Sequence, residues 1–355
     1  MKFVTIEEGK TQAIVPEHKK GPGPRGTDLP IFYNPAMEFN RDVSISFLKA
    51  WGVEGKNLLD GMAASGIRGV RMANELAPEK VALTDISHES VELIKRNIEL
   101  NGVDAQVHHE SLERHLLDNR GTYQYVDLDP FGTPVPYLPT VLRYLARGGV
   151  VAVSATDTSV LCGTYPKKCW RYYSAKPSNN WCRHENGLRI LVGHIVREAA
   201  RYDRGAVPML SYYDGHHFRT YVTLEKGAKK ADAALSKLEC FEFSDHHWIS
   251  GGDIGPMYTG KLTSQIIYDM APLGKLDEGR LEIWRRESEM PPFFYDSSAL
   301  SKYLKVSPPP LDDILVALKD EGYKAVKTHF SPTGFKTNSP ADIVSTVFNK
   351  ISYGH

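Results

Sequence analysis

Between residues 56 and 157, a short apolar run followed by a helical pattern recurs five times. The apolar runs lie at 57–60, 81–85, 105–111, 125–129 and 149–157. Consecutive strand–helix units of this kind fold into a parallel sheet with helices on both faces. Residues 206–213 and 218–224 indicate two more strands joined by Asp214-Gly215, which would close the sheet with a reversed last strand. The chain is therefore predicted to contain a Rossmann-like α/β domain.

The length of the chain leaves room for a second, smaller domain. With 355 residues and 41% hydrophobic content, the chain can bury two cores. Its composition changes near 226–230, so we predict domains at 1–225 and 226–355. Helical patterns at 297–304 and 311–321, followed by strands at 323–328 and 334–337, indicate an α+β domain with a winged-helix-like unit. Lys324, Lys327, His329 and Lys336 would line its wing and contact a phosphate backbone.

The charge of the chain and the absence of targeting signals limit where the protein is expected to reside and what it is expected to bind. Lys+Arg and Asp+Glu are both 43, so any surface for nucleic acid must come from local segregation of charge. The first residues carry acids where a signal peptide needs an apolar core, and no apolar run approaches the ~18 residues of a membrane span. We therefore expect a cytoplasmic protein without a membrane partner or an obligatory protein partner. The four cysteines form no C-x-x-C pair and are predicted to be free, mostly buried thiols.

The segment 125–132, Tyr-Val-Asp-Leu-Asp-Pro-Phe-Gly, places acids and an aromatic ring where a buried strand ends. Pro130 cannot donate to a sheet ladder, so the strand opens into a loop there. Asp127 and Asp129 are two residues apart and point the same way on an extended strand. Ligands of open α/β sheets bind at this end of the strands. A carboxylate at Asp129 followed by Phe131 suits a flat polar ring, although a simple tight turn explains the same residues.

The loop after the first strand of the sheet distinguishes between cofactors. Its glycines at 61, 66 and 69 lack the G-x-G-x-x-G spacing that a dinucleotide requires. S-adenosylmethionine has a ribose for Asp85, about twenty residues further on. Its adenine would meet the strand exit at Glu110-Ser111, and its carboxylate needs a cation such as Arg41 or Arg68. Both arginines could equally form surface salt bridges.

Three other segments carry possible function. Cations alternate with aromatic residues in 162–173, which suits a nucleic-acid backbone with stacked bases, or equally the packing of a large loop on the sheet. His216 and His217 lie at a predicted hairpin turn and are expected to be surface residues. The segment 18–26, which is basic and rich in proline and glycine, is expected to form a mobile surface loop.

Taken in order along the chain, several blocks resemble the tRNA (guanine-26,N2)-dimethyltransferase family. The blocks are Phe32-Tyr33-Asn34-Pro35, Asn40-Arg41-Asp42, Ser65-Gly66-Ile67-Arg68-Gly69, Thr84-Asp85-Ile86-Ser87, Asp127-Leu128-Asp129-Pro130-Phe131-Gly132, Ala155-Thr156-Asp157, Leu161-Cys162-Gly163, Gly255-Pro256 with Gly260, and His329-Phe330-Ser331-Pro332-Thr333-Gly334. They extend over the whole chain. The resemblance implies a class I methyltransferase domain, S-adenosylmethionine as methyl donor, S-adenosylhomocysteine as product, and tRNA as partner.

The resemblance also implies roles for individual residues. Cofactor contacts are expected at Arg41, Arg68, Asp85, Glu110 and Ser111. Asp129 is expected to be catalytic, with the target guanine held by Phe32 and Phe131. Two departures matter: Glu110-Ser111 stands where relatives often have Asp-Ala, and only Cys240 stands where some relatives have cysteine pairs for zinc. We therefore predict no metal site.

The residues also suggest a mechanism. The exocyclic N2 of guanine is a poor nucleophile because its lone pair is delocalised into the ring. A carboxylate at Asp129 would accept its N–H, orient the amine and take up the proton that is released. A base paired in folded tRNA must first be flipped out, and Phe32 and Phe131 would receive it.

Two alternatives remain open at this stage. A methyltransferase for another exocyclic amine, such as adenine N6, would usually carry Asn/Asp-Pro-Pro-Tyr, and Phe131 after a single proline argues against it. A non-catalytic RNA-binding module is disfavoured by the intact set Arg41, Asp85 and Asp129.

Overall fold

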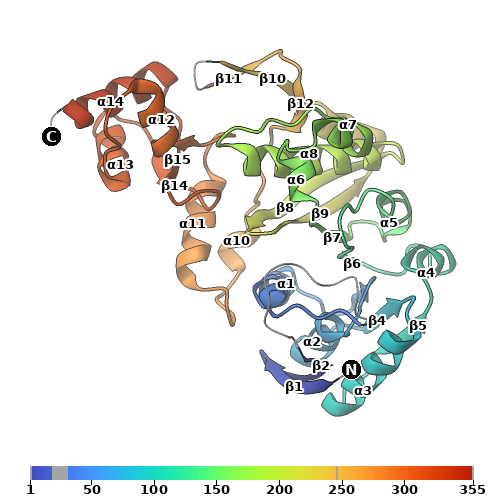
Figure 1. The fold of residues 1–355 in the computed structure, drawn as a ribbon. Coiled ribbons are helices and arrows are strands. Elements are labelled where there is room, and N and C mark those ends of the chain that lie inside the picture. The colour runs from blue at the N-terminus through green and yellow to red at the C-terminus, as the bar shows by residue number, and fades with distance from the viewer. Residues whose placement is uncertain (1, 18–30, 245–246, 354–355) are drawn as a thin grey trace.

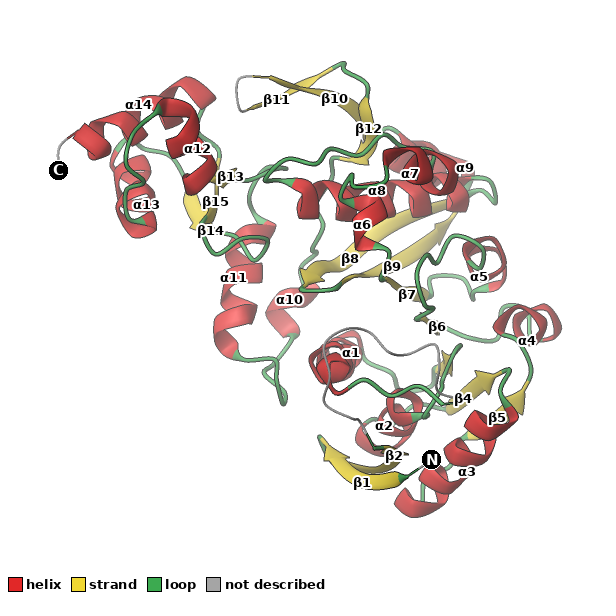
Figure 2. Ribbon diagram, in the orientation of Figure 1, coloured by secondary structure: helices red, strands yellow, loops and turns green. Residues whose placement is uncertain are grey.

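The computed structural model describes residues 2–17, 31–244 and 247–353, so the whole of the predicted loop at 18–26 lies outside the described residues. A seven-stranded sheet forms the centre, in the order β5-β4-β3-β6-β7-β9-β8 (Figure 2). The strands are β3 (Asn57–Asp60), β4 (Lys80–Asp85), β5 (Gln106–His109), β6 (Tyr125–Leu128), β7 (Val150–Ala155), β8 (Arg204–Asp214) and β9 (His217–Lys226). Strands β3 to β7 are parallel, and β9 is antiparallel to both of its neighbours. The predicted Rossmann-like sheet with a reversed last strand is confirmed.

Helices cover both faces of this sheet (Figure 1). One face carries α1 (Glu38–Trp51), α2 (Ile67–Glu75), α3 (His88–Asn101), α10 (Ile266–Asp269) and α11 (Glu278–Ser288). The other carries α4 (Leu112–Asp118), α5 (Leu138–Tyr144), α6 (Thr158–Leu161), α7 (Pro166–Tyr173), α8 (Arg183–Ala200) and α9 (Ala228–Leu235). Strand side chains alternate between the two cores: Val151 and Val153 face α8, whereas Val150 and Ala152 face α1. The sheet is therefore buried on both sides, as its uninterrupted apolar runs require.

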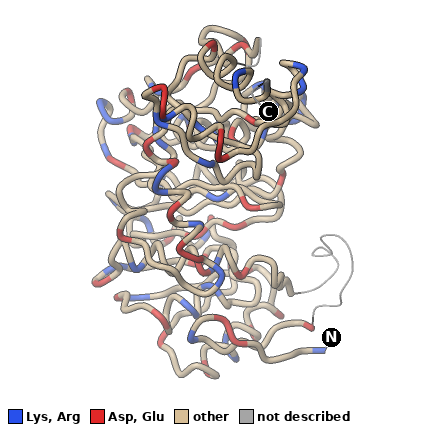
Figure 3. The backbone as a smooth tube through the Cα atoms, turned by 90° about the vertical axis from the view of Figure 1, so that its left-hand side faces the viewer, with Lys and Arg blue, Asp and Glu red and all other residues tan. Residues whose placement is uncertain are grey.

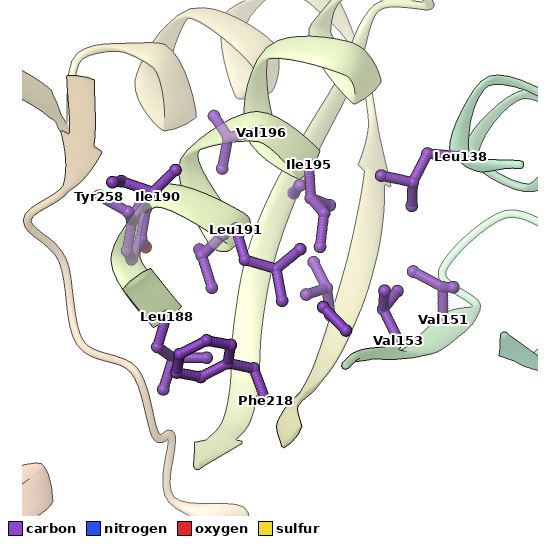
Figure 4. Close-up of a cluster of buried hydrophobic side chains, with 14 of the residues drawn as sticks. Leu138, Val151, Val153, Leu188, Ile190, Leu191, Ile195, Val196, Phe218 and Tyr258 are labelled. Carbon is purple, nitrogen blue, oxygen red and sulfur yellow. The ribbon is translucent and has the colours of Figure 1, made fainter. Parts of the chain in front are cut away.

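The long helix α8 is the centre of one core. Figure 4 shows Leu188, Leu191 and Ile195 pointing from it toward Val153 of β7 and Phe218 of β9. These side chains are fully buried. Their spacing of three and four residues gives the helix one continuous apolar face.

The chain beyond β9 adds two further units. Strands β10 (Leu238–Ser244), β11 (His247–Ser250) and β12 (Ile254–Tyr258) form a small antiparallel sheet beside α8. A C-terminal unit follows, with β13 (Tyr295–Asp296), α12 (Ser297–Leu304), α13 (Leu311–Asp320), β14 (Ala325–Lys327), β15 (Gly334–Thr337) and α14 (Ala341–Tyr353). Its helices pack on a sheet of order β13-β15-β14, around a core of its own that includes Leu318 and Phe335. The α+β architecture is as predicted, and its winged-helix character stays a prediction.

The other elements are short or peripheral. The hairpin of β1 (Phe3–Glu8) and β2 (Thr11–Pro16) packs on α2 and α3, and the turn η1 (Pro35–Met37) leads into α1. All four cysteines are free thiols and three of them are buried, which confirms that prediction. Among the described residues, no helix is long and apolar enough to cross a membrane.

Candidate active site

Asp127 and Asp129 bind the same arginine at the carboxyl end of β6. Arg68 of α2 donates from Nη2 to Asp129 Oδ2 at 2.6 Å, and its Nε lies 3.5 Å from Asp127 Oδ1. Asp127 is fully buried, and Arg219 of β9 donates to both of its oxygens, at 3.1 and 2.5 Å. Burial raises the pKa of Asp127, but the charges of Arg219 and Arg68 outweigh it and leave the pKa lowered. Asp127 is therefore an ionised anchor for two arginines.

Asp129 differs from Asp127 because it lies at the opening of the site. Its side chain is 22% exposed. One carboxylate oxygen is bonded to Arg68, and the described residues provide no hydrogen bond to the other. A carboxylate with one oxygen held and one available is oriented and can still accept a proton donor.

The loop that follows Asp129 brings two aromatic rings together. Phe32 and Phe131 meet edge to face, with ring centroids 4.7 Å apart, although 99 residues separate them in the chain. Phe131 is 60% exposed, unusual for a phenylalanine that has a structural role alone. The loop that carries it is fixed by mutual hydrogen bonds between Gly132 and Thr156: the Gly132 N–H donates to Thr156 Oγ1, and the Thr156 N–H donates to the Gly132 carbonyl.

Asp85 occupies the end of the neighbouring strand β4. Its two carboxylate oxygens each accept a backbone N–H at 2.8 Å, from Ala64 and from Ser87. These bonds tie the loop after β3 to the loop after β4. Ile86, the next residue, is 74% exposed, a signal that the sequence did not single out. An acid with oriented oxygens beside an exposed aliphatic side chain can bind a ribose and cover the face of an attached base.

Arg41 is bonded to Glu8 in this structure. Its Nε and Nη2 donate to the two Glu8 oxygens, at 2.7 and 2.5 Å, and both side chains are almost fully buried. The Tyr33 hydroxyl also donates to Glu8, and its ring lies against the guanidinium of Arg41. Glu8 was missed in the sequence because nothing local links β1 to α1. The predicted contact of Arg41 with the cofactor stays a prediction.

Glu110 and Ser111 both have partners within the chain. Glu110 Oε1 is hydrogen-bonded to His115 Nδ1 at 2.8 Å. Ser111 is the N-cap of α4, and its Oγ accepts the Arg114 N–H. His108, Glu110 and His115 together have ligand atoms within 4.8 Å of one another, a spacing that could hold a metal ion. The Nε2 of His115 is bonded to the Tyr123 hydroxyl at 2.7 Å, which leaves its Nδ1 as the nitrogen on the side of Glu110. The cofactor role of Glu110 and Ser111 and the absence of a metal stay predictions.

His217 corrects one expectation from the sequence. It was expected at the surface of a turn, but it is 3% exposed at the start of β9, and its Nε2 accepts from Asn40 Nδ2 at 2.9 Å. Burial lowers its pKa to about 4, although the carboxylates of Asp129 and Asp214 act in the opposite direction. The prediction failed because α1, which buries His217, is remote in sequence. A neutral imidazole therefore lies within electrostatic reach of Asp129.

The predicted basic wing is also partly wrong. Lys336 is buried and bonded to Glu185 of α8 at 2.7 Å, and His329 pairs with Glu287 of α11 at 2.6 Å. Both side chains join the C-terminal unit to the rest of the chain and cannot reach a phosphate backbone. Lys324 and Lys327 remain exposed. The alternation of side chains along β14 and β15 gave no sign that α8 and α11 cover one face of this hairpin, so the burial of Lys336 and His329 was not predicted.

Comparison with known proteins places this geometry in one family. Residues 9–349 match the family described as N2,N2-dimethylguanosine tRNA methyltransferase. The chain belongs to this family. It is 38% identical to the tRNA (guanine(26)-N(2))-dimethyltransferase of Thermococcus kodakarensis, over 99% of this chain and 100% of that one. The corresponding protein of Thermoplasma acidophilum is 35% identical over 96% of each chain.

A solved structure of the family superposes on almost the whole fold. The Trm1 protein from Pyrococcus horikoshii, in complex with S-adenosyl-L-methionine, has a TM-score of 0.89 and 34% sequence identity. The match covers 97% of this chain and 99% of that protein. Both the sheet and the C-terminal unit are thus family features.

Proposed function

We infer that the protein transfers one or two methyl groups from S-adenosylmethionine to the exocyclic N2 of guanine 26 in tRNA. The products are N2-methylguanosine or N2,N2-dimethylguanosine, and S-adenosylhomocysteine. The observation that carries this conclusion is that Arg68 orients Asp129, while Phe131, two residues further along the same loop, meets Phe32 edge to face. Family membership over residues 9–349 supports the substrate class.

The residues around the carboxyl edge of the sheet fit the methyl donor. Asp85 presents carboxylate oxygens fixed by two backbone N–H groups, as a ribose requires, and Ile86 is exposed beside it. Arg41 and Arg68 supply positive charge for the donor's carboxylate. Glu110 and Ser111 complete the proposed set at the next strand exit. When bound, S-adenosylmethionine supplies an electrophilic methyl group on a sulfonium.

Asp129 acts on the nucleophile. Its free oxygen accepts an N–H of the guanine amine and so directs the nitrogen lone pair toward the methyl group. As the new N–C bond forms and the C–S bond breaks, the amine loses a proton, which Asp129 takes up and passes to solvent. Arg68 keeps the carboxylate in position through its bonds to Asp129 and Asp127. Alignment of the reacting atoms at about 3–3.5 Å supplies most of the acceleration.

The ring pair holds the target base. A guanine in folded tRNA has to leave its stack before its N2 can reach the carboxylate of Asp129. Phe131 is exposed and is held on a loop that Thr156 fixes, so its face is available without rearrangement of the backbone. We propose that the guanine replaces the edge-to-face contact of Phe32 and Phe131 by lying between or against these rings.

The experiment that tests the function uses unmodified tRNA transcripts with G or A at position 26. The protein is incubated with each transcript and labelled S-adenosylmethionine, and the nucleosides are analysed by mass spectrometry. We expect label in N2-methylated guanosine with the G26 transcript and none with the A26 transcript. Label in another nucleoside would move the reaction to another base, such as adenine N6. Cofactor binding without any label would favour an RNA-binding module.

The remaining expectations belong to the same proposal. tRNA is the partner that the family implies, and a cytoplasmic location and the lack of an obligatory protein partner stay predictions. Residues 1–225 are proposed to carry the chemistry and residues 226–355 the RNA contact.

A further inference from the structure

Helix α7 is bonded to the loop that carries the catalytic residues. Its inner face is formed by Cys169 and Tyr173, both fully buried. The Tyr173 hydroxyl donates to Asp157 and is hydrogen-bonded to Thr133 Oγ1, both at 2.8 Å. Thr133 follows Phe131 by two residues, so α7 is attached directly to the loop that presents Phe131.

The outer face of α7 has the opposite character. Lys167, Trp170 and Arg171 are three and four residues apart and therefore lie on one side of the helix. All three are exposed, Trp170 by 62%, and Tyr165 just before the helix is 57% exposed. The stretch from Tyr165 to Tyr173 contains no acidic residue.

The charges on this face are not neutralised within the described part of the chain. The structure gives Lys167 and Arg171 no ion-pair partner there, whereas other exposed cations, such as Arg286 with Glu282 and Lys95 with Glu92, have one. In Figure 3, charges of both signs are interspersed over the molecule. Because the net charge is zero, attraction of a polyanion has to come from local faces of this kind.

We propose that the outer face of α7 is a tRNA-docking surface. This proposal rests on the proposed function. Lys167 and Arg171 would neutralise phosphates, and the exposed ring of Trp170 would stack on a base. Two exposed cations without an ion-pair partner in the described part of the chain favour a polyanion, whose phosphates would neutralise both. Tyr173 joins α7 to Thr133 in the loop that carries Phe131. RNA bound to the outer face of α7 would therefore contact the helix to which this loop is attached.

The test measures the affinity of the full-length protein for an unmodified tRNA transcript at several salt concentrations. The double variant Lys167→Gln with Arg171→Gln should weaken binding and reduce the slope of log Kd against log salt by about 2, one unit for each phosphate contact. Trp170→Ala should weaken binding by at least about fivefold, the lower end for a stacked base. Trp170→Phe should recover most of this loss because it keeps an aromatic face.

Controls separate docking from folding and from catalysis. Arg96 occupies an exposed position of α3, which packs at the other end of the sheet. Arg96→Gln should therefore change neither the affinity for tRNA nor the salt slope. Each variant should retain the wild-type affinity for S-adenosylmethionine, which shows that the site is folded. Folded α7 variants with wild-type tRNA affinity and salt slope would overturn the proposal.

The failure of docking and the failure of the proposed function are distinguishable. Wild-type protein that methylates G26 while the α7 variants bind tRNA normally would refute docking alone. Wild-type protein that binds tRNA through α7 without methylating G26 would refute the reaction and leave docking supported. Wild-type protein without affinity for tRNA would overturn both.

Discussion

The two aspartates of the Asp-Leu-Asp motif share an arginine and have different surroundings. Asp127 is fully buried between Arg68 and Arg219, whereas Asp129 keeps 22% of its side chain exposed. Two hydrogen bonds from Arg219 and an ion pair with Arg68 hold Asp127 ionised inside the protein. The exposed position leaves Asp129 free to meet a substrate. At the residue scale, one acid organises the site and the other is available for the chemistry.

The first prediction concerns Asp129. Asp129→Asn removes the proton acceptor but keeps the shape of the side chain, so turnover should fall by about 10²–10⁴-fold while affinity for S-adenosylmethionine is retained. Methylation of the transcript and calorimetric cofactor binding provide the two measurements. Asp118→Asn, on the exposed end of α4, is the matched control and should be as active as the wild type. Wild-type turnover by Asp129→Asn would remove this residue from the mechanism.

The second prediction concerns Arg219, which has two bonds to Asp127. Arg219→Met leaves a buried carboxylate with a single, more distant arginine, so the free energy of unfolding should fall by about 3–5 kcal/mol. Urea unfolding of both proteins measures the difference. Arg96→Met, an exposed site on α3, should change stability by less than about 0.5 kcal/mol. Equal losses for the two variants would contradict the role given to Arg219.

At the scale of elements, the loop after β6 brings Phe131 against Phe32 from the segment before α1. Phe32→Ala and Phe131→Ala should each lower kcat/KM for tRNA, by an amount equivalent to about 1–3 kcal/mol per stacked base. Cofactor affinity should remain unchanged. Because the rings are in contact, with centroids 4.7 Å apart, the double variant should lose less than the sum of the single losses. Strict additivity in this double-mutant cycle would indicate that the rings act independently.

Helix α11 and the β14–β15 hairpin are joined by a buried carboxylate. Burial raises the pKa of Glu287, but His329 and Lys336 outweigh it and lower the pKa to about 2. Its contribution to stability is therefore complete above the ordinary pKa near 4.5 and is lost as the pH falls through about 2. The wild type should lose about 3 kcal/mol more than Glu287→Gln over this range. Urea unfolding as a function of pH checks this, and identical pH profiles would refute it.

At the scale of the whole molecule, residues on both sides of position 226 share the two large cores. Phe241, Met257 and Tyr258 pack with α8, and Ile267 and Trp284 pack with α1. The proposed division at 225/226 is thus one of roles, with the chemistry before it and RNA contact after it, to which the proposed docking face of α7 adds an RNA contact before it. The fifth prediction is that a chain ending at residue 225 exposes these apolar surfaces and shows no cooperative unfolding transition. Calorimetry measures this, and a cooperative transition near that of the full chain would contradict it.

Much of the site could be placed from the sequence because parallel strands end at one edge of a sheet. Alternation of strands and helices determined the order of the βα units, and the polar exits then brought Asp85, Asp129 and Phe131 to a common edge. In the structure, Arg68 and Phe32 also lie at that edge, where they contact Asp129 and Phe131. Local pattern was sufficient for Asp85, Asp129 and Phe131 because each lies within a few positions of the end of its own strand, whereas the role of Phe32 was implied by the family resemblance.

Other features depended on contacts between remote segments. The burial of His217 requires α1, the bond of Arg41 to Glu8 requires β1, and the burial of Lys336 requires α8. Side-chain type and periodicity carry no information about which distant element covers a residue. The sequence by itself determined the class of the sheet, the edge at which its strands end and the acids at that edge. Only the tertiary structure decided which charges are paired and which remain exposed, because desolvation and ion pairing depend on neighbours that the fold brings together.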